Sequence, residues 1–166
     1  MYIDKWWGEY LGESEDSYTL IDYFNEGEEK DYPLSKIFRD FYLEEQIAKG
    51  SFRTTADIRY MSADGVHYSE IDIVINLMAD IAAILLECLH NEEVSLKDLN
   101  DGIGKEKKIR VTPTPGEFDC LLEVLDDFAS SYMDYELAEL CDEETMREIA
   151  GQCSEIAQEL RRYLKN

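Results

Sequence analysis

Apolar residues recur at three- and four-residue intervals over much of the chain, and this spacing predicts a mainly helical fold. The two clearest stretches run from Phe118 to Tyr132, after a candidate cap at Thr114, and from Met146 to Leu164. Shorter stretches predict three further helices: residues 1–11 ending near Gly12, a second helix capped by Asp16 or Ser17, and a third from Pro33 to Gly50.

The longest apolar segment runs from Ile71 to Leu89 and predicts the central helix of the fold, over residues 70–91 with Ser69 as its cap. Its polar residues recur near multiples of 3.6 and form one narrow stripe, which consists of Asp72, Asn76, Asp80 and Glu87. A membrane span needs about 20 predominantly apolar residues with few charges. The interrupting acids therefore indicate a core helix.

A small β element is expected beside these helices. Phe52 to Met61 is rich in Thr, Arg, Ile and Tyr and predicts a strand, the turn at Asp64-Gly65 leads to a second short strand at 66–68, and Lys107 to Thr112 predicts a third. The sequence contains no internal repeat and no linker. It predicts one mainly helical α+β domain over residues 1–166, with about five to seven helices around the central apolar helix.

The charge of the chain excludes several functions. Its 166 residues carry 38 acidic and 16 basic side chains, a formal net charge of −22. Nucleic acids and anionic membranes attract clustered Lys and Arg, so neither is an expected partner. A hydrophobic content of 45% still supports a folded core. The N-terminus lacks the pattern of a signal peptide, which favours a cytoplasmic protein with reduced cysteines.

Candidate chemistry is sparse. Cys88 and His90 form a C-x-H pair that Cys120, Cys141 and Cys153 could complete as a zinc site, but the spacings match no zinc finger or ribbon. The chain has no nucleophile elbow and no glycine-rich phosphate loop. We therefore expect no metal, no cofactor and no enzymatic activity.

The negative charge is unevenly distributed. Residues 1–50 carry 13 acids and 5 bases (net −8), residues 51–110 carry 11 and 7 (net −4), and residues 111–166 carry 14 and 4 (net −10). Two predicted loops concentrate it, with tyrosines close by. Because opposite fields raise association rates and favour specific pairing, we expect these loops to bind a basic protein, through Glu13, Glu15, Asp16 and Tyr18 in the first loop and Asp134, Tyr135, Glu136 and Glu139 in the second.

Two N-terminal segments, Trp6-Trp7-Gly8-Glu9-Tyr10-Leu11-Gly12 and Glu15 to Tyr23, resemble the opening of small acidic bacterial proteins that are encoded beside polymorphic or contact-dependent toxins. Residues 33–38 and the segment 71–89 are similar to the continuation. The resemblance implies an immunity protein, a cytoplasmic inhibitor without catalysis of its own that binds a cognate toxin domain, often a nuclease. It carries over no binding residues.

Two other functions remain open on the residues alone. An acidic adaptor or nucleic-acid mimic would regulate a resident basic protein and would have no toxic neighbouring gene. An enzyme would use scattered carboxylates or an unrecognised metal site. The sequence does not specify the toxin or the oligomeric state.

Overall fold

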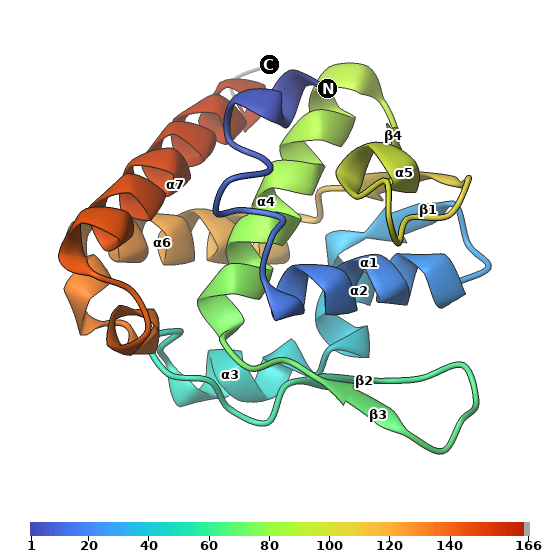
Figure 1. Cartoon of the computed structure of the whole chain (residues 1–166), viewed down its shortest axis with the longest axis horizontal. Coiled ribbons are helices and arrows are strands. Elements are labelled where there is room, and N and C mark those ends of the chain that lie inside the picture. The colour runs from blue at the N-terminus through green and yellow to red at the C-terminus, as the bar shows by residue number, and fades with distance from the viewer. Residues whose placement is uncertain (165–166) are drawn as a thin grey trace.

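The long apolar segment forms helix α4 (Val74–Asn91), which lies at the centre of the fold (Figure 1). The computed structural model describes residues 1–164. Within them, α4 alone has the length and hydropathy that could cross a membrane, and 78% of it is buried inside the fold. Such burial is typical of a core helix, as the sequence predicts.

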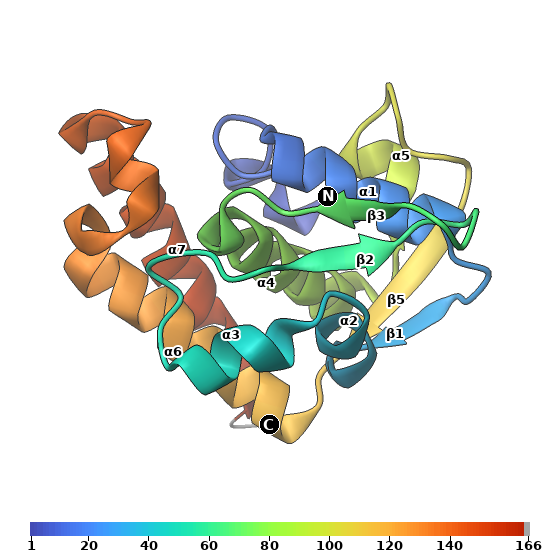
Figure 2. The ribbon, with the colours of Figure 1, turned by 90° about the horizontal axis from the view of Figure 1, so that it is seen from below.

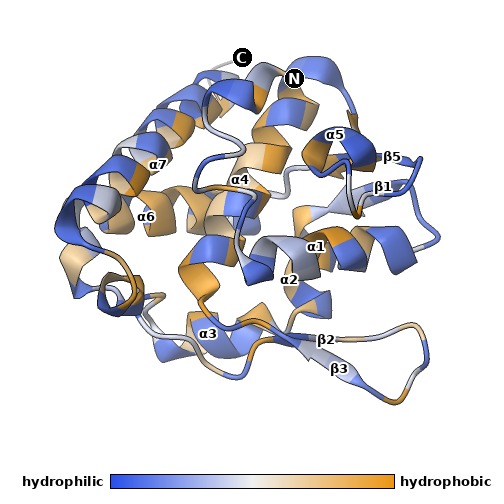
Figure 3. Ribbon diagram, in the orientation of Figure 1, coloured by the Kyte–Doolittle hydropathy of each residue, from blue (hydrophilic) through white to orange (hydrophobic). Residues whose placement is uncertain are grey.

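Other helices surround α4. On one side lie α6 (Pro115–Ser131) and α7 (Glu143–Leu164), and on the other lies α1 (Glu15–Glu26) (Figure 1). Figure 3 shows the long α7 alternating between apolar and hydrophilic residues along its length, while α4 is apolar over most of its turns. The buried stripe of α7 follows the prediction at Met146, Ile149, Cys153, Ile156 and Leu160, while Leu164, which was also expected on it, is 54% exposed.

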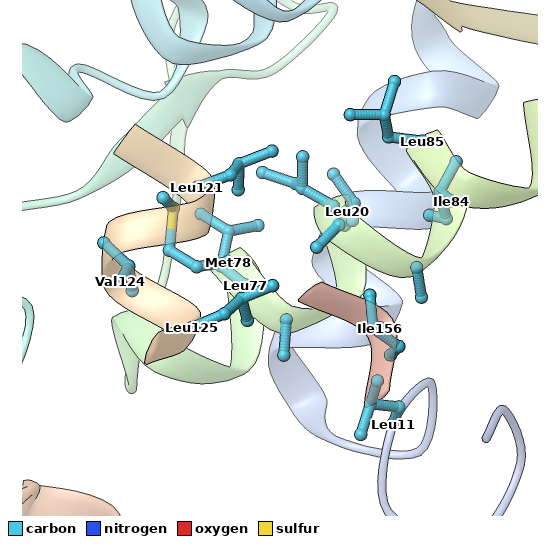
Figure 4. Packing of buried hydrophobic residues seen from close by; sticks show 14 of the residues in the cluster. Leu11, Leu20, Leu77, Met78, Ile84, Leu85, Leu121, Val124, Leu125 and Ile156 are labelled. Atoms are coloured by element: carbon cyan, nitrogen blue, oxygen red, sulfur yellow. The ribbon is translucent and has the colours of Figure 1, made fainter. Parts of the chain in front are cut away.

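The core forms where side chains of these four helices meet. Leu77 and Met78 of α4 lie beside Leu121 and Leu125 of α6, and Leu20 of α1 lies close by (Figure 4). Each of these side chains is almost completely excluded from solvent. Burial of one such side chain contributes about 1.5–3 kcal/mol relative to leaving it exposed, so this cluster is a main source of stability.

Two small sheets complete the fold. Strand β5 (Lys108–Thr112) lies between β1 (Asp31–Pro33), which is parallel to it, and β4 (Val94–Ser95), which is antiparallel. Strands β2 (Arg59–Met61) and β3 (Tyr68–Glu70) form a separate antiparallel hairpin. The remaining helices are short: α2 (Leu34–Asp40), α3 (Leu43–Lys49) and α5 (Leu96–Leu99). The predicted mainly helical α+β fold is confirmed.

The predicted helix over residues 1–11 is wrong beyond its first turn. A 3₁₀ helix, η1 (Tyr2–Lys5), is followed by turns in which Gly8 has a φ of 107°. Hydrogen bonds from aromatic side chains hold this segment instead. Trp6 Nε1 donates to Glu155 at 2.6 Å, and the hydroxyls of Tyr2 and Tyr10 donate to two further glutamates of α7, Glu159 and Glu148.

The predicted helix from Pro33 to Gly50 is two helices. Tyr42 has a φ of 60°, in the left-handed region, and separates α2 from α3.

The predicted strand from Phe52 to Met61 is also much shorter, because the buried side chain of Gln46 forms hydrogen bonds with backbone groups of the residues that precede β2. Gln46 Nε2 donates to the carbonyl of Thr54, and its Oε1 accepts from the amide of Ala56 at 2.7 Å. This stretch therefore remains irregular up to β2.

Candidate functional site

The first predicted loop begins helix α1 with a different cap from the expected one. Ser14 Oγ accepts from the amide of Ser17 at 3.1 Å, so neither Asp16 nor Ser17 is the cap. Glu13 and Glu15 are exposed, and the half-buried Tyr18 places its hydroxyl 3.5 Å from a carboxylate oxygen of Glu13. These three residues lie where a partner can reach them.

Asp16, by contrast, is 2% exposed and caps the central helix. Its carboxylate accepts from the amides of Asp72 and Ile73 at 2.8 and 3.0 Å, directly before α4. Burial raises the pKa of Asp16, while these hydrogen bonds oppose that effect. The interpretation of Asp16 as a surface contact is therefore corrected to an internal cap, and Ser69, the predicted cap, lies in β3.

Replacement of Asp16 by alanine is expected to lower the free energy of unfolding by about 1–2 kcal/mol, because two amides at the start of α4 lose their acceptor. Asp16→Asn keeps an acceptor oxygen for one of the two amides but turns its NH2 group toward the other, so it is expected to recover only part of this loss. Urea denaturation at pH 7 measures both differences. Equal stability of Asp16→Ala and the wild type would contradict the capping role.

The second predicted loop consists of two 3₁₀ turns, η2 (Tyr132–Asp134) and η3 (Glu136–Glu139). Tyr135 between them is 2% exposed, and its hydroxyl donates to Asp127 at 2.6 Å. Arg53 donates two hydrogen bonds to the same carboxylate and lowers the pKa of Asp127. Tyr135 thus anchors the loop to α6 and offers a partner almost no surface.

Both loops converge on the N-terminus of α4. The amide of Val74 donates to Thr55 Oγ1 at 2.8 Å, and the hydroxyl of Thr55 donates in turn to the carboxylate of Glu136. Asp16 caps the preceding amides, as described above. Because a helix N-terminus carries partial positive charge, it favours the approach of these two carboxylates, which are far apart in the sequence.

A small depression lies between the two loops. Tyr10, Leu11 and Ser14 line one side of it, and Leu137 and Ile149 line the other. Asp80 of α4 also lines it and is fully buried, with its carboxylate accepting from the amide of Gly12 at 3.0 Å and from the hydroxyl of Ser17. Burial raises the pKa of Asp80 to about 7. This carboxyl connects the first loop to the central helix.

The second loop also exposes apolar side chains that sequence reasoning missed. We call residues 133–140 the acidic arm. Met133 is 46% and Leu140 is 71% exposed, beside the exposed Asp134 and Glu139. Figure 2 shows the arm projecting beyond the end of α6, on the side of the molecule that also carries the loop before α1. The sequence signal that could have identified them is the presence of two isolated apolar residues, Met133 and Leu140, in an acidic stretch.

Cys88 and His90, whose C-x-H pair is not expected to bind zinc, have other partners in the fold. Cys88 packs against β5, where its sulfur accepts from the amide of Val111, and the ring of His90 stacks on Tyr2 with centroids 3.9 Å apart. Burial raises the pKa of Cys88 to about 11 and that of Cys153 to about 12, so both remain thiols at neutral pH. Across residues 1–164, no group of three or more His, Cys, Asp or Glu side chains is placed to hold a metal.

The fold thus presents charged and apolar side chains on exposed loops and, across residues 1–164, no cluster placed to hold a metal. Comparison with protein families identifies the family to which the chain belongs. The model of the family described as immunity protein 68 matches residues 2–160, and the chain belongs to this family. The resemblance to bacterial immunity proteins is confirmed, and with it the general function of toxin neutralisation. No curated protein and no solved structure matches the chain.

Proposed function

We propose that this immunity protein acts in the cytoplasm by binding a basic, nuclease-type toxin domain directly, and that the first acidic loop and the acidic arm make the contact. The contact residues are Glu13, Glu15 and Tyr18 with Asp134, Glu136 and Glu139, while Asp16 and Tyr135 position them from inside. The observation that carries the proposal is the exposure of Leu140 and Met133 among these carboxylates.

The two kinds of side chain have different roles in such a contact. The net charge of −22 attracts a basic domain over long range and raises the association rate. A few residues that become fully buried at the centre of an interface contribute most of the binding energy, and the residues around them mainly exclude water. The arm combines both on one projecting segment, and Glu136 is already held by Thr55. Little ordering of the arm is then needed on binding.

Co-expression tests whether the chain neutralises the toxin, and stopped-flow mixing at different salt concentrations tests whether its acidic surface attracts the toxin. The probe is the C-terminal domain encoded by the neighbouring upstream gene. We expect this domain to be toxic alone and harmless beside this chain, and we expect a stable complex of the purified proteins. Toxicity that persists on co-expression would overturn the assignment to that partner.

The association rate is expected to fall by at least about tenfold between about 10 mM and about 1 M salt, over which the Debye length shrinks from about 30 to about 3 Å. A rate that stays constant over this range would contradict acidic steering, while leaving neutralisation intact. An acidic adaptor would instead bind a resident basic protein and would not rescue growth.

A further inference from the structure

The β2–β3 hairpin forms a sheet of its own, separate from the three-stranded sheet. It extends from the body of the molecule, with β2 on the side of α2 and α3 and with β3 as its outer strand (Figure 2). Because this sheet has only two strands, each strand has one edge that the other does not pair with. The two edges differ in what covers them.

The pairing of the hairpin determines which backbone groups of β3 face outward. In an antiparallel pair, residues whose backbone groups bond to the partner strand alternate with residues whose groups point away from it. The amide of Ile71 donates across the hairpin to the carbonyl of Ile58 at 2.9 Å, and this bond fixes the alternation. Ser69 therefore bonds to β2, while the amide and carbonyl groups of Tyr68 and Glu70 point away from it.

The outer edge of β3 is free, whereas that of β2 is closed by the body of the molecule. On β2, the amide of Arg59 donates to the carbonyl of Phe41, directly after α2, at 3.4 Å. Within residues 1–164, the outward groups of Tyr68 and Glu70 have no such backbone partner. Soluble proteins commonly protect an edge strand with Lys or Pro, and residues 66–71 contain neither. This edge can therefore pair with an added strand.

Exposed apolar side chains lie beside the free edge. Val66 in the turn is 71% exposed, Tyr68 in β3 is 45% exposed, and Met61, opposite Tyr68, is 40% exposed. The guanidinium of Arg59 lies 4.9 Å from the centroid of the Tyr68 ring and holds this ring in place. The carboxylate of Asp64 accepts from the amide of Val66 at 2.8 Å and orders the turn. The edge is thus ordered before a partner arrives, which lowers the entropy cost of binding.

The free edge is also continuous with the first acidic loop. Asp72, two residues after β3, donates its amide to the carboxylate of Asp16 at 2.8 Å, so the end of the strand is tied to the start of α1. Glu70 and Asp72 are exposed, as is Glu15 beside Asp16. A strand that pairs with β3 therefore extends toward the carboxylates that are proposed to contact the toxin.

We propose that β3 is a docking site for an extended segment of the toxin, which joins the hairpin as a third strand. The inference rests on the proposed function, because toxin binding supplies the partner. The backbone groups of Tyr68 and Glu70 pair with the added segment, and the exposed rings and methyl groups of Tyr68 and Val66 contact its side chains. A second copy of this chain is the wrong occupant, because two chains of charge −22 repel each other.

The experiment compares Glu70→Pro with Glu70→Gln in the full chain, with the toxin domain of the upstream gene as the binding probe. Both variants lose the same charge, but only proline removes the outward amide and places its ring at the edge. Proline is tolerated on an edge strand where the amide faces solvent, so Glu70→Pro is expected to fold, and thermal unfolding checks this. We expect Glu70→Pro to raise the dissociation constant at least about tenfold more than Glu70→Gln does.

Hydrogen exchange on the wild type gives a second measurement that needs no variant. We expect the amides of Tyr68 and Glu70 to exchange at least about tenfold more slowly in the complex than in the free chain. If the wild type binds the toxin but these two amides exchange at unchanged rates, or if the two variants bind equally well, the strand pairing is wrong and the proposed function stands.

Two further outcomes concern the identity of the partner. If light scattering shows a dimer of the wild type and the two amides are protected without toxin, a second copy of the chain occupies the edge and the inference is overturned. If the wild type does not bind the toxin at all, the proposed function fails and this inference fails with it.

Discussion

Replacement of Asp80 by asparagine is expected to make the protein more stable than the wild type at pH 8. The difference in free energy of unfolding between the variant and the wild type is expected to be on the order of 3 kcal/mol larger at pH 8 than at pH 4. Asp80 lies completely buried in α4, and burial raises the pKa of its carboxyl from 3.8 to about 7. The charges of Asp16 and Glu13 act in the same direction, while the bonds from Ser17 and Gly12 oppose it. Asparagine keeps an oxygen for the amide of Gly12 and carries no charge to bury.

The direction of the pH dependence follows from proton binding. Between about pH 4 and pH 7 the folded protein retains the Asp80 proton and the unfolded chain has lost it, so the contribution of this group to stability falls as pH rises. Above about pH 7 both states are ionised, and the full cost of the buried charge remains. The Asp80→Asn variant lacks this cost. Its advantage over the wild type therefore grows from pH 4 to pH 8.

Urea denaturation of both proteins at pH 4, 6 and 8, at constant ionic strength, measures the difference. The comparison isolates Asp80, because other carboxyls such as Asp127, whose pKa Arg53 lowers, titrate equally in both proteins. An advantage of Asp80→Asn that is the same at all three pH values would show that the wild-type carboxyl titrates normally. In that outcome the role of Asp80 is positional, because its carboxylate fixes the first acidic loop through the amide of Gly12 and the hydroxyl of Ser17.

Elements whose signal is local could be predicted from the sequence. The apolar stripes of α6 and α7 repeat over four or more turns, so their period identifies both the helix and its buried face. The narrow polar stripe of α4 likewise indicated its central place. Strand β5 followed from a short β-branched run. In each case the residues that determine the element lie within it.

Elements that depend on distant side chains could not be predicted in this way. The cap of α4 comes from Asp16, 56 residues before Asp72, and from Thr55, 19 residues before Val74. Gln46 similarly holds the stretch before β2 in an irregular form. A pattern search assigns an acidic residue near a helix start to the nearest helix, which explains the error at Asp16. Strand β1 was missed because it has three residues and ends in proline.

The same distinction applies to the candidate surface. Sequence clustering identified eight residues by charge and aromatic character, and the fold divides them by burial. Asp16 and Tyr135 are internal anchors, and Glu136 is engaged with Thr55. Glu13, Glu15, Asp134 and Glu139 keep exposed carboxylates. Charge and aromatic character alone therefore included two buried residues, Asp16 and Tyr135, that offer a partner almost no surface, and overlooked the exposed apolar residues Met133 and Leu140.

Replacement of Leu140 by aspartate is expected to weaken toxin binding by at least about thirtyfold, equivalent to ~2 kcal/mol, and to abolish rescue on co-expression at matched protein levels. Leu140 is 71% exposed, so the folded chain gains little from it, and its loss is expected to leave the free energy of unfolding within about 0.5 kcal/mol of the wild-type value. Isothermal titration with the purified toxin domain measures the affinity.

The added charge makes this variant a sharp test of how the arm works. Aspartate at position 140 raises the negative charge of the arm, so attraction to a basic toxin alone would accelerate association. Weaker binding through faster dissociation would therefore assign the binding energy to apolar contact at Leu140. Ile103→Asp makes the same chemical change on a distant loop, at a side chain that is 38% exposed, and is expected to bind like the wild type. If Leu140→Asp binds as tightly as Ile103→Asp, the acidic arm is not the centre of the interface, and the carboxylates of the first acidic loop must supply the affinity.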